Sequence, residues 1–264
     1  MKSTLRNLFL ATFAIVIVVV LAGCGKSSTT TNASNTITTG KLTIGLEGTY
    51  APYSYRQNGK LTGFDVEVAT NVAKKLDLKP VFVQSKWDSL IAGLDVKKYD
   101  VVFNNVVVTP SREKSYNFTK PYMYSKSGLV VKKTSTITAV SQIKGKKTAE
   151  TASSNNAVDA KRIGSEVVPV PGFAEALDLV QSGQVVGTIN SREAFLTYEK
   201  ANPKNNLVYI NAGQEIPIQK IAGILSKSNP KLKTKIDKAL IELREDGTLE
   251  KLSKKYFNGD VTNN

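Results

Sequence analysis

The sequence predicts an α/β fold with mostly parallel, helix-flanked sheets, and three observations lead to this prediction. Short aliphatic runs alternate with amphipathic stretches from residue 41 onward. Strands that alternate with helices are typical of parallel sheets, because a helix returns the chain to the start of the next strand. A length of 264 residues, with 41% hydrophobic and 22% charged residues, fits one large or two small globular domains.

The first half of the chain supplies three expected strands and two expected helices. Residues 41–46 alternate as a strand does, and Asn58-Gly59 signals a turn. Asp65 is expected to cap a helix that ends at Pro80, and residues 81–83 to form the next strand. A helix over residues 89–96 and a strand over residues 100–108 follow. The apolar stripe of the capped helix consists of Val68, Ala69, Val72, Ala73 and Leu76.

The second half repeats this rhythm on what looks like a second unit. Strands are expected over residues 129–131, from Gly145 to Ala149, and over residues 185–189, with a helix over residues 174–181. The C-terminal part is expected to be helical. Asn229 stands in a cap position with Pro230 in the first turn, Asp246-Gly247 break that helix, and residues 249–257 form the last one.

The N-terminus has the pattern of a bacterial lipoprotein signal. Lys2 and Arg6 precede an apolar stretch, Leu8 to Leu21, that is short for a membrane-spanning helix, and small residues follow it. The segment Leu21-Ala22-Gly23-Cys24 looks like a lipobox. This likeness implies that residues 1–23 are a signal peptide and that Cys24, the one cysteine, becomes a lipidated N-terminus. The alternative is an uncleaved signal anchor with an incidental cysteine.

Residues 24–40 are predicted to be the lipidated cysteine and a flexible tether, because residues 25–40 are almost entirely Ser, Thr, Asn, Ala and Gly. Loss of residues 1–23 would lower the formal net charge from +14 to +12. The basic residues are scattered lysines without a nucleic-acid-binding motif, so we predict no nucleic-acid partner. A lysine-rich surface beside anionic envelope polymers is the simpler interpretation.

Four segments of the body share their pattern and order with a known family. They are GLEGTYAPYSY, KLTGFDVEVATNVAKKL, VVVTPSREKSYNFTKPY and EDGTLEKLSKKYF. Together they resemble the polar amino-acid binding proteins of ABC importers, which are extracellular solute-binding proteins of family 3. The resemblance covers roughly residues 41–261. It implies a two-lobed type II periplasmic-binding-protein fold with two hinge crossings. Lobe 1 would be residues 41–127 plus 218–264, and lobe 2 residues 128–217.

Arg112 is the first ligand-binding residue that the resemblance implies. In relatives, the arginine after the "TP" turn binds the α-carboxylate of the ligand, and Arg112 stands at that position. The chemistry agrees, because a guanidinium offers a planar fork to a carboxylate and keeps its charge when it is desolvated. The alternative is an arginine in a surface salt bridge.

The resemblance implies nine further ligand-binding residues. Glu47 and Tyr50 match positions that face the ligand's side chain, Tyr53 a stacking position, and Trp87 an apolar contact that could equally be plain core. The remaining matches fall into two groups around the ligand's ammonium and carboxylate. Asn104 and Asn105 match residues at the ammonium, Ser154 and Asn155 match residues whose backbone N–H groups complete the carboxylate cradle, and Ser191 falls where relatives carry an ammonium-binding aspartate.

Ser191 is the one departure from the family pattern, because it is neutral. Either Glu47 or Glu150 supplies the missing counter-charge, or the ligand is bound differently. The segments TAETASSNNA and "GTIN" and the ending KLSKKYFNGDVT look most like cystine-binding members, and no excess acid is expected in the cleft. Cystine or cysteine is therefore the predicted ligand, with glutamine or another neutral polar amino acid as the alternative.

The resemblance also implies the partners and the location. We expect a monomer, lipid-anchored on the outer face of the cytoplasmic membrane of a one-membrane envelope, that closes on an amino acid and docks on an ABC permease and its ATPase. No metal or organic cofactor is implied. Two other classes stay open, namely a secreted dehydratase-type enzyme of the same fold and a surface adhesin. The absence of histidine excludes His-dependent triads and common zinc sites.

Overall fold

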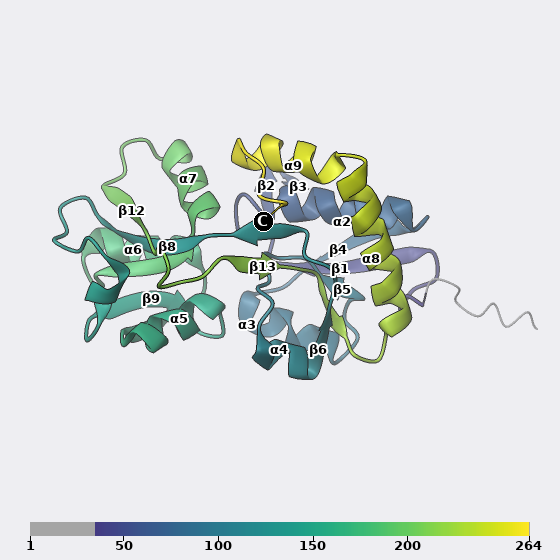
Figure 1. Cartoon of the computed structure of the whole chain (residues 1–264), viewed down its shortest axis with the longest axis horizontal. Coiled ribbons are helices and arrows are strands. Elements are labelled where there is room, and N and C mark those ends of the chain that lie inside the picture. Colours follow the sequence, from purple (N-terminus) through teal and green to yellow (C-terminus); the bar gives the residue numbers. More distant parts are fainter. Residues whose placement is uncertain (1–34, 264) are drawn as a thin grey trace, which may run out of the picture. The chain divides into compact units, whose positions relative to one another are not determined.

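Two five-stranded sheets organise residues 35–263, which are the residues that the computed structural model describes. The first sheet has the order β4-β1-β5-β14-β6 (Figure 1). Strands β4 and β5 run parallel to β1, whereas β14 runs antiparallel to β5 and β6. Its strands are β1 (Lys41–Leu46), β4 (Lys79–Gln84), β5 (Val101–Val102), β6 (Tyr116–Phe118) and β14 (Ile224–Ser226).

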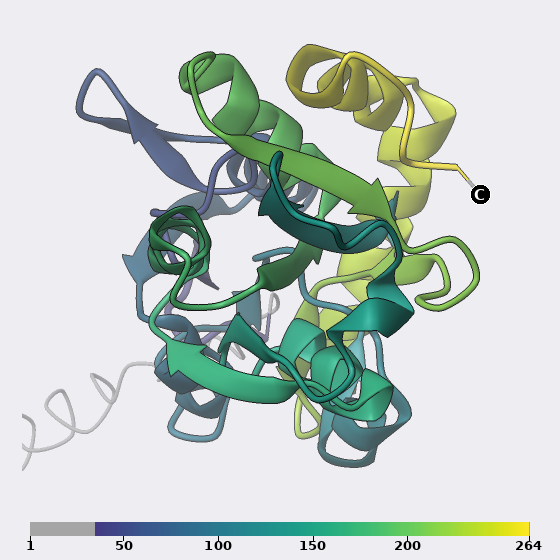
Figure 2. The same cartoon turned by 90° about the vertical axis from the view of Figure 1, so that its left-hand side faces the viewer.

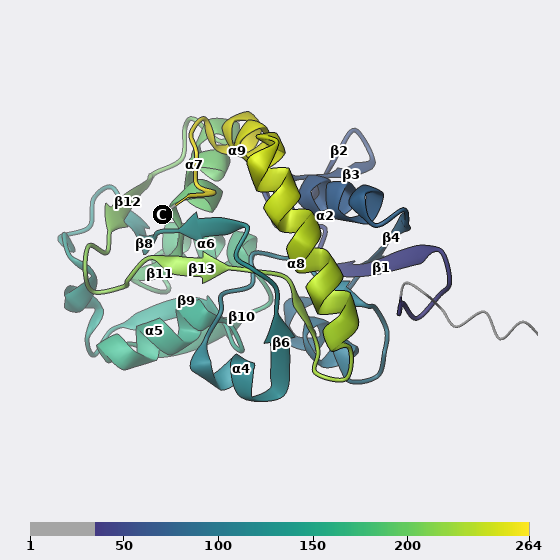
Figure 3. The same ribbon diagram turned by 45° about the vertical axis from the view of Figure 1, so that its right-hand side comes forward.

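Helix α2 (Phe64–Lys75) packs against the two C-terminal helices on one face of the first sheet. Its buried Val68 and Val72 join the same core cluster as Ile44 of β1 and Ile236 of α8 (Pro230–Glu245). Figure 3 shows α8 lying across this sheet, with α9 (Thr248–Phe257) after it. The shorter elements near this sheet are the hairpin β2 (Tyr55–Gln57) and β3 (Lys60–Thr62), then α3 (Trp87–Leu90), a 3₁₀ turn at Ala92–Leu94, and α4 (Pro110–Ser115).

The second sheet has the order β10-β9-β11-β8-β12. Its elements, coloured teal to green, face the viewer in Figure 2. Strands β10, β9 and β11 are parallel, and β8 runs antiparallel to β11 and β12. Its strands are β8 (Ser127–Lys132), β9 (Lys147–Thr151), β10 (Glu166–Val170), β11 (Gly187–Ser191) and β12 (Leu207–Asn211), with a 3₁₀ turn at Val140–Ile143. Both sheets are therefore mixed rather than purely parallel, and the predicted α/β class is confirmed.

Side chains of β8 alternate between the two faces of this sheet, as a strand period of two requires. Leu129 and Val131 share a core cluster with Ala160 of α5 (Asn155–Ile163). Val130 points the other way and shares a cluster with Leu177 of α6 (Phe173–Ser182). Helices α5 and α6 therefore cover opposite faces. Helix α7 (Arg192–Ala201) follows β11 directly.

Two segments carry the chain between the sheets. Strand β7 (Met123–Ser125) leads into β8, and β13 (Gln219–Ile221) leads toward β14. The two form an antiparallel pair in which Gln219 lies opposite Ser125 (Figure 1). The chain thus passes twice from one sheet to the other by adjacent, paired segments.

The predicted cap of α2 is wrong. The N-cap is Gly63 at φ 129°, where an added Cβ would lie 2.2 Å from the carbonyl oxygen of Tyr53. Asp65 lies inside the first turn and is fully buried. Its carboxyl accepts hydrogen bonds from Asn105 N at 2.6 Å and from Tyr122 Oη at 2.9 Å. Asp65 does not cap the helix, because its carboxyl bonds to residues 40 and 57 positions away in the sequence.

Two further elements are shorter than predicted. The helix expected over residues 89–96 is α3 plus the 3₁₀ turn, and the strand expected over residues 100–108 is β5 alone. Strand β5 stops because Asn104 turns its side chain to Glu47 and Asn105 takes a positive φ of 49°. The Asn58-Gly59 turn and the Asn229 cap are confirmed, since β2 and β3 form a hairpin and Asn229 accepts from Leu232 N at 3.2 Å.

Within residues 35–263, no helix is long and apolar enough to cross a membrane. Cys24, the predicted signal peptide and most of the predicted tether lie outside the described residues.

Candidate ligand-binding cleft

A cavity of about 470 Å³ is lined by residues that follow strands of both sheets. Ligands of open α/β sheets bind at such carboxyl ends of strands. Nine of the ten predicted binding residues line it, namely Glu47, Tyr50, Trp87, Asn104, Asn105, Arg112, Ser154, Asn155 and Ser191. Tyr53, the tenth, is fully buried and does not line the cavity.

Arg112 lies in α4 and points into the cavity. Thr109 caps that helix and Pro110 opens it, which explains why the chain turns directly after the "TP" pair. The guanidinium donates from NH1 to the carbonyl oxygen of Val107 at 3.0 Å and from NH2 to that of Ser153 at 3.4 Å. Its carbon lies 5.4 Å from the centre of the Trp87 ring. These contacts fix the fork but leave its charge without a balancing anion.

Burial lowers the pKa of Arg112 to about 10, and no other cause opposes that effect. None of the ion pairs formed within residues 35–263 includes Arg112. The side chain therefore stays protonated at neutral pH in a place that disfavours its charge. A partly buried cation without an acidic partner is best stabilised by an anion that enters the cavity.

Glu47 is held by Asn104, which is fully buried. Asn104 Oδ1 accepts from Glu47 N at 2.8 Å and from Ser54 Oγ at 3.2 Å, so Asn104 Nδ2 points to the Glu47 carboxylate at 2.6 Å. Burial raises the pKa of Glu47, the bond from Asn104 opposes this, and the charges of Asp88 and Glu175 raise it further. One oxygen of the Glu47 carboxylate is thus positioned by Asn104, and the residue lines the cavity.

The second candidate for the missing counter-charge does not line the cavity. Glu150 is 1% exposed and accepts from Ile189 N at 2.7 Å, and its pKa is raised well above the ordinary value by burial. Of the two acids proposed from the sequence, only Glu47 faces the cavity.

Two cavity residues carry buried polar atoms that have no partner in the part of the chain that the structure describes. They are Nε1 of Trp87 and Oδ1 of Asn105. Trp87 also packs with Leu90 in a core cluster, so it is both a core residue and part of the cavity wall. An unpaired donor and an unpaired acceptor beside one cavity are satisfied most directly by a polar ligand or by water.

Tyrosines from the loop after β1 reach across to the end of β11. Tyr50 Oη donates to Asn190 Oδ1 at 2.6 Å, and Tyr53 Oη donates to Ser191 Oγ at 2.9 Å. Ser191 Oγ also accepts from Ala194 N at 3.3 Å and so caps α7. The oxygen of Ser191 therefore already accepts two hydrogen bonds, one of them from Tyr53 of the other wall.

The turn before α5 differs in detail from the expected cradle. The N–H of Ser154 donates to the carbonyl oxygen of Thr151 at 2.9 Å, and Ser154 Oγ accepts from Ala157 N at 3.1 Å. Both groups of Ser154 are thus occupied within the turn. The N–H groups that the turn leaves for a ligand belong to Asn155 and Asn156, whose residues line the cavity.

The charged lining is balanced, as the sequence suggested. Glu47 and Arg112 are partly buried, whereas Lys86 and Glu175 are exposed at the edge of the cavity. Sequence reasoning missed many wall residues, among them Lys86, Phe173, Glu175 and Gln219. For Phe173 and Glu175, the Pro171-Gly172 pair before α6 was an available signal, because it marks a strand-to-helix turn at the same sheet edge. No cluster of acidic, histidine or cysteine side chains within residues 35–263 is arranged to hold a metal ion.

Two α/β sheets joined by paired segments, with a charged cleft at their strand ends, define a class of proteins that capture small solutes. The chain belongs to the bacterial extracellular solute-binding proteins, family 3, whose model matches residues 42–259.

Three relatives illustrate the similarity. A probable amino-acid ABC transporter-binding protein of Haemophilus influenzae is 41% identical over 84% of this chain and 86% of its own length. The L-cystine-binding protein TcyA of Bacillus subtilis is 37% identical over 98% of this chain and 100% of its own length. The solved L-cystine solute receptor of Neisseria gonorrhoeae, in an unliganded open conformation, is 38% identical, with a TM-score of 0.59 over 85% of this chain and 95% of that one.

Proposed function

We propose that this chain is the extracytoplasmic binding component of an ABC amino-acid importer and that its ligand is L-cystine. The observation that carries the proposal is Arg112, a partly buried guanidinium that faces the cavity without an acidic partner among residues 35–263. An α-carboxylate supplies the missing anion, and a planar fork suits it. Relatives named as L-cystine-binding proteins support the choice of ligand.

The charge pattern of the cleft supports a ligand with two amino-acid ends. Arg112 and Glu47 form an inner pair for one carboxylate and one ammonium, and Lys86 and Glu175 form an outer pair for the second end. L-Cystine carries two carboxylates and two ammonium groups, so both pairs are used and no charge is left over. Arginine would bring one excess positive charge to this balanced lining, and glutamine would leave the outer pair without a partner.

We further propose that binding closes two lobes, residues 41–127 plus 218–264 and residues 128–217. The contacts that join the walls support this, because Tyr50 bonds Asn190 and Arg112 bonds the carbonyl oxygen of Ser153 across the cleft. A ligand that contacts both walls stabilises the closed arrangement by its differential affinity. The closed form would dock as a monomer on the permease, with Cys24 as the lipid anchor on the outer face of the cytoplasmic membrane.

The proposal includes no catalytic turnover. The sequence has no histidine, and the relatives reported above are named as binding proteins. Glu47 and Glu175 are the acids of the cleft, and our account uses both to bind ammonium groups.

A thermal-shift screen of the purified protein tests the proposed function. The panel is L-cystine, L-cysteine, L-glutamine, L-arginine and prephenate, in buffer without reductant. L-Cystine at about 100 times its dissociation constant should raise the melting temperature by several degrees. A larger shift with L-glutamine would replace the ligand and keep the importer class. A shift with prephenate, together with its turnover in a separate assay, would favour the dehydratase. No shift with any amino acid would favour the adhesin.

Glu175→Gln tests the outer pair separately. It should weaken L-cystine by about tenfold and leave L-cysteine, which has a single amino-acid end, unchanged within about twofold. Equal losses for both ligands would contradict the assignment of Glu175 to the second end.

A further inference from the structure

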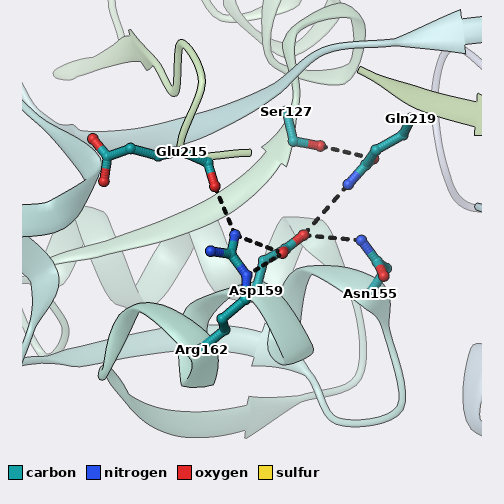
Figure 4. Close-up of polar contacts among 6 residues, drawn as sticks. All are labelled: Ser127, Asn155, Asp159, Arg162, Glu215 and Gln219. Atoms are coloured by element: carbon teal, nitrogen blue, oxygen red, sulfur yellow. Dashed lines mark hydrogen bonds and ion pairs between the residues drawn. The ribbon is translucent and has the colours of Figure 1, made fainter. Parts of the chain in front are cut away.

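A polar network behind the cleft joins helix α5 to the connecting strand β13 and to the start of β8 (Figure 4). Asp159 of α5 is its centre and is 9% exposed. Asp159 Oδ1 accepts from Arg162 Nε at 3.2 Å and from NH2 at 3.0 Å, and Arg162 NH2 also donates to the carbonyl oxygen of Glu215 at 2.7 Å. Arg162 therefore occupies one carboxylate oxygen and leaves the other for different donors.

Asp159 Oδ2 receives two side-chain amides. Asn155 Nδ2 donates to it at 2.9 Å, and Gln219 Nε2 donates at 3.4 Å. Gln219 Oε1 in turn accepts from Ser127 Oγ at 3.1 Å. Gln219 begins the connecting strand β13, and Ser127 begins β8, the strand that follows the connecting strand β7. The network therefore reaches one connecting segment and the strand next to the other.

The chemistry of a carboxylate decides how both amides are turned. A carboxylate only accepts hydrogen bonds, so each amide must direct its nitrogen to Asp159 and its oxygen elsewhere. For Gln219 the oxygen meets the hydroxyl of Ser127 (Figure 4). For Asn155 no hydrogen bond to Oδ1 forms within residues 35–263, and the residue lines the cleft. Asp159 thus leaves Asn155 with a free acceptor at the cleft.

Asp159 and Arg162 do not line the cleft, whereas Asn155, Gln219 and Ser127 do. The Arg162 pair alone would satisfy the charge of Asp159. The two amides are extra partners, and both belong to the wall that a ligand meets. The arrangement therefore fixes the hydrogen-bonding face of that wall in addition to holding the helix.

We propose that Asp159 is a positioning residue for ligand binding. It fixes the amides of Asn155 and Gln219 in one orientation, so that Asn155 Oδ1 accepts a hydrogen bond from an N–H group of the ligand. The inference rests on the proposed function, because it takes the ligand to be an amino acid with an ammonium group. In this account, part of the selectivity for an ammonium-bearing ligand arises from a residue that never touches the ligand.

A double-mutant cycle on L-cystine affinity, measured by calorimetric titration of the purified protein, tests the proposal. Asp159→Asn keeps the shape but offers both donor and acceptor atoms, so the amides can turn over. It should weaken L-cystine by about tenfold. In an Asn155→Ala background the same change should cost less than about twofold, because the positioned group is gone. Glu166→Gln removes one negative charge from an exposed position of the same sheet and should leave affinity unchanged.

The ligand 3,3′-dithiodipropionate adds a readout that a purely structural role would not change, because it lacks both ammonium groups. Asp159→Asn should weaken it less than about twofold. The proposal is overturned if Asp159→Asn weakens both ligands equally. It is also overturned if Asp159→Asn weakens L-cystine as much in the Asn155→Ala background as in wild type. If Asp159→Asn does not fold, Asn155→Ala alone replaces it, since it leaves the Arg162 pair intact and removes the acceptor that we assign to the ligand's N–H group. An unchanged affinity in that variant would also overturn the proposal.

The outcomes separate this inference from the function on which it rests. If the wild-type protein binds neither L-cystine nor another amino acid, the proposed function fails. If the wild-type protein binds L-cystine and Asp159→Asn binds it equally well, the proposed function stands and the role of Asp159 fails.

Discussion

The two walls of the cleft differ in how they meet a ligand. The wall that follows the first sheet carries the partly buried charges, Arg112 and Glu47. Arg112 bonds Val107 of the same wall and Ser153 of the other, and Glu47 is held by Asn104. The wall that follows the second sheet is mostly neutral, and Asn155, Asn190 and Ser191 are among its polar groups. Its one acid in the cavity, Glu175, lies exposed at the edge. The difference suggests that the first wall supplies most of the binding energy and the second wall supplies closure and selectivity.

Among the variants of the two walls, Arg112→Ala should have the largest effect on L-cystine affinity. The variant removes the guanidinium that we assign to the ligand's carboxylate, and loss of one partner of a buried charge pair costs about 2–5 kcal/mol. L-Cystine affinity should fall by about 30-fold to a few thousand-fold in a calorimetric titration. Arg112→Lys is the control, because it keeps the charge but loses the fork, and its loss should be smaller. An affinity within threefold of wild type for Arg112→Ala would move the carboxylate site elsewhere.

Glu47→Gln should have the next largest effect. It removes the counter-charge for the ammonium while an amide keeps the size and the contact with Asn104. A hydrogen bond to a charged group contributes about 1.5–3 kcal/mol, which corresponds to a loss of about 10- to 150-fold in affinity.

Ser191→Asp in the Glu47→Gln background moves the acid from the first wall to the second. Aspartate still caps α7, so the fold should be kept. Recovery of part of the lost affinity would show that either wall is able to hold the ammonium. A further loss would contradict Glu47 as its partner.

Tyr50→Phe should have a smaller effect on affinity. It removes the 2.6 Å bond to Asn190 that joins the walls and keeps the ring, whose edge contact with Phe173 lies at 6.4 Å between centroids. One neutral hydrogen bond contributes about 0.5–1.5 kcal/mol, so affinity should weaken by about 2- to 12-fold. Small-angle scattering should show less closure at subsaturating ligand. Unchanged affinity and closure would mean that this contact does not couple the walls.

Asp65→Asn should have the smallest effect. The variant changes how the stability of the fold depends on pH. Burial raises the pKa of Asp65 to about 7 from an ordinary 3.8, and bonds from Tyr122 and Asn105 oppose the rise. The folded state therefore binds the proton more tightly than the unfolded state. The resulting stabilisation is full below about pH 4 and is lost as the pH rises through 7. The variant mimics the protonated form, so its melting temperature should fall a few degrees less than that of wild type between pH 5 and pH 8. Equal slopes would contradict the raised pKa.

Local signals explain what the sequence predicted of the fold. The helix after Asn229-Pro230 was predicted because adjacent residues form its N-cap and its first turn. The cap of α2 was missed because Asp65 is recruited by Tyr122 and Asn105, and no local pattern reveals such distant partners. The strand that contains β5 was predicted too long for the same reason. Asn104 directs its side chain to Glu47, a distant residue that follows the neighbouring strand β1.

The site shows the same division. Motif positions placed Arg112, Glu47 and Asn155 at the cleft, because they stand beside turns that sequence patterns mark well. Tyr53 was placed in the cleft but is buried behind it, where its hydroxyl meets Ser191. Glu175 and Gln219 were missed because they reach the cavity only through the pairing of the connecting segments and the start of α6.

A titration with two ligands tests whether Arg112 binds a ligand carboxylate. Wild type and Arg112→Ala are each titrated with L-cystine and with cystamine, which has the same disulfide and amines but no carboxylates. We expect wild type to bind L-cystine at least about 30-fold more tightly than cystamine, and we expect this preference to fall to within a few-fold in Arg112→Ala. If the preference persists unchanged in Arg112→Ala, Arg112 does not bind the carboxylate.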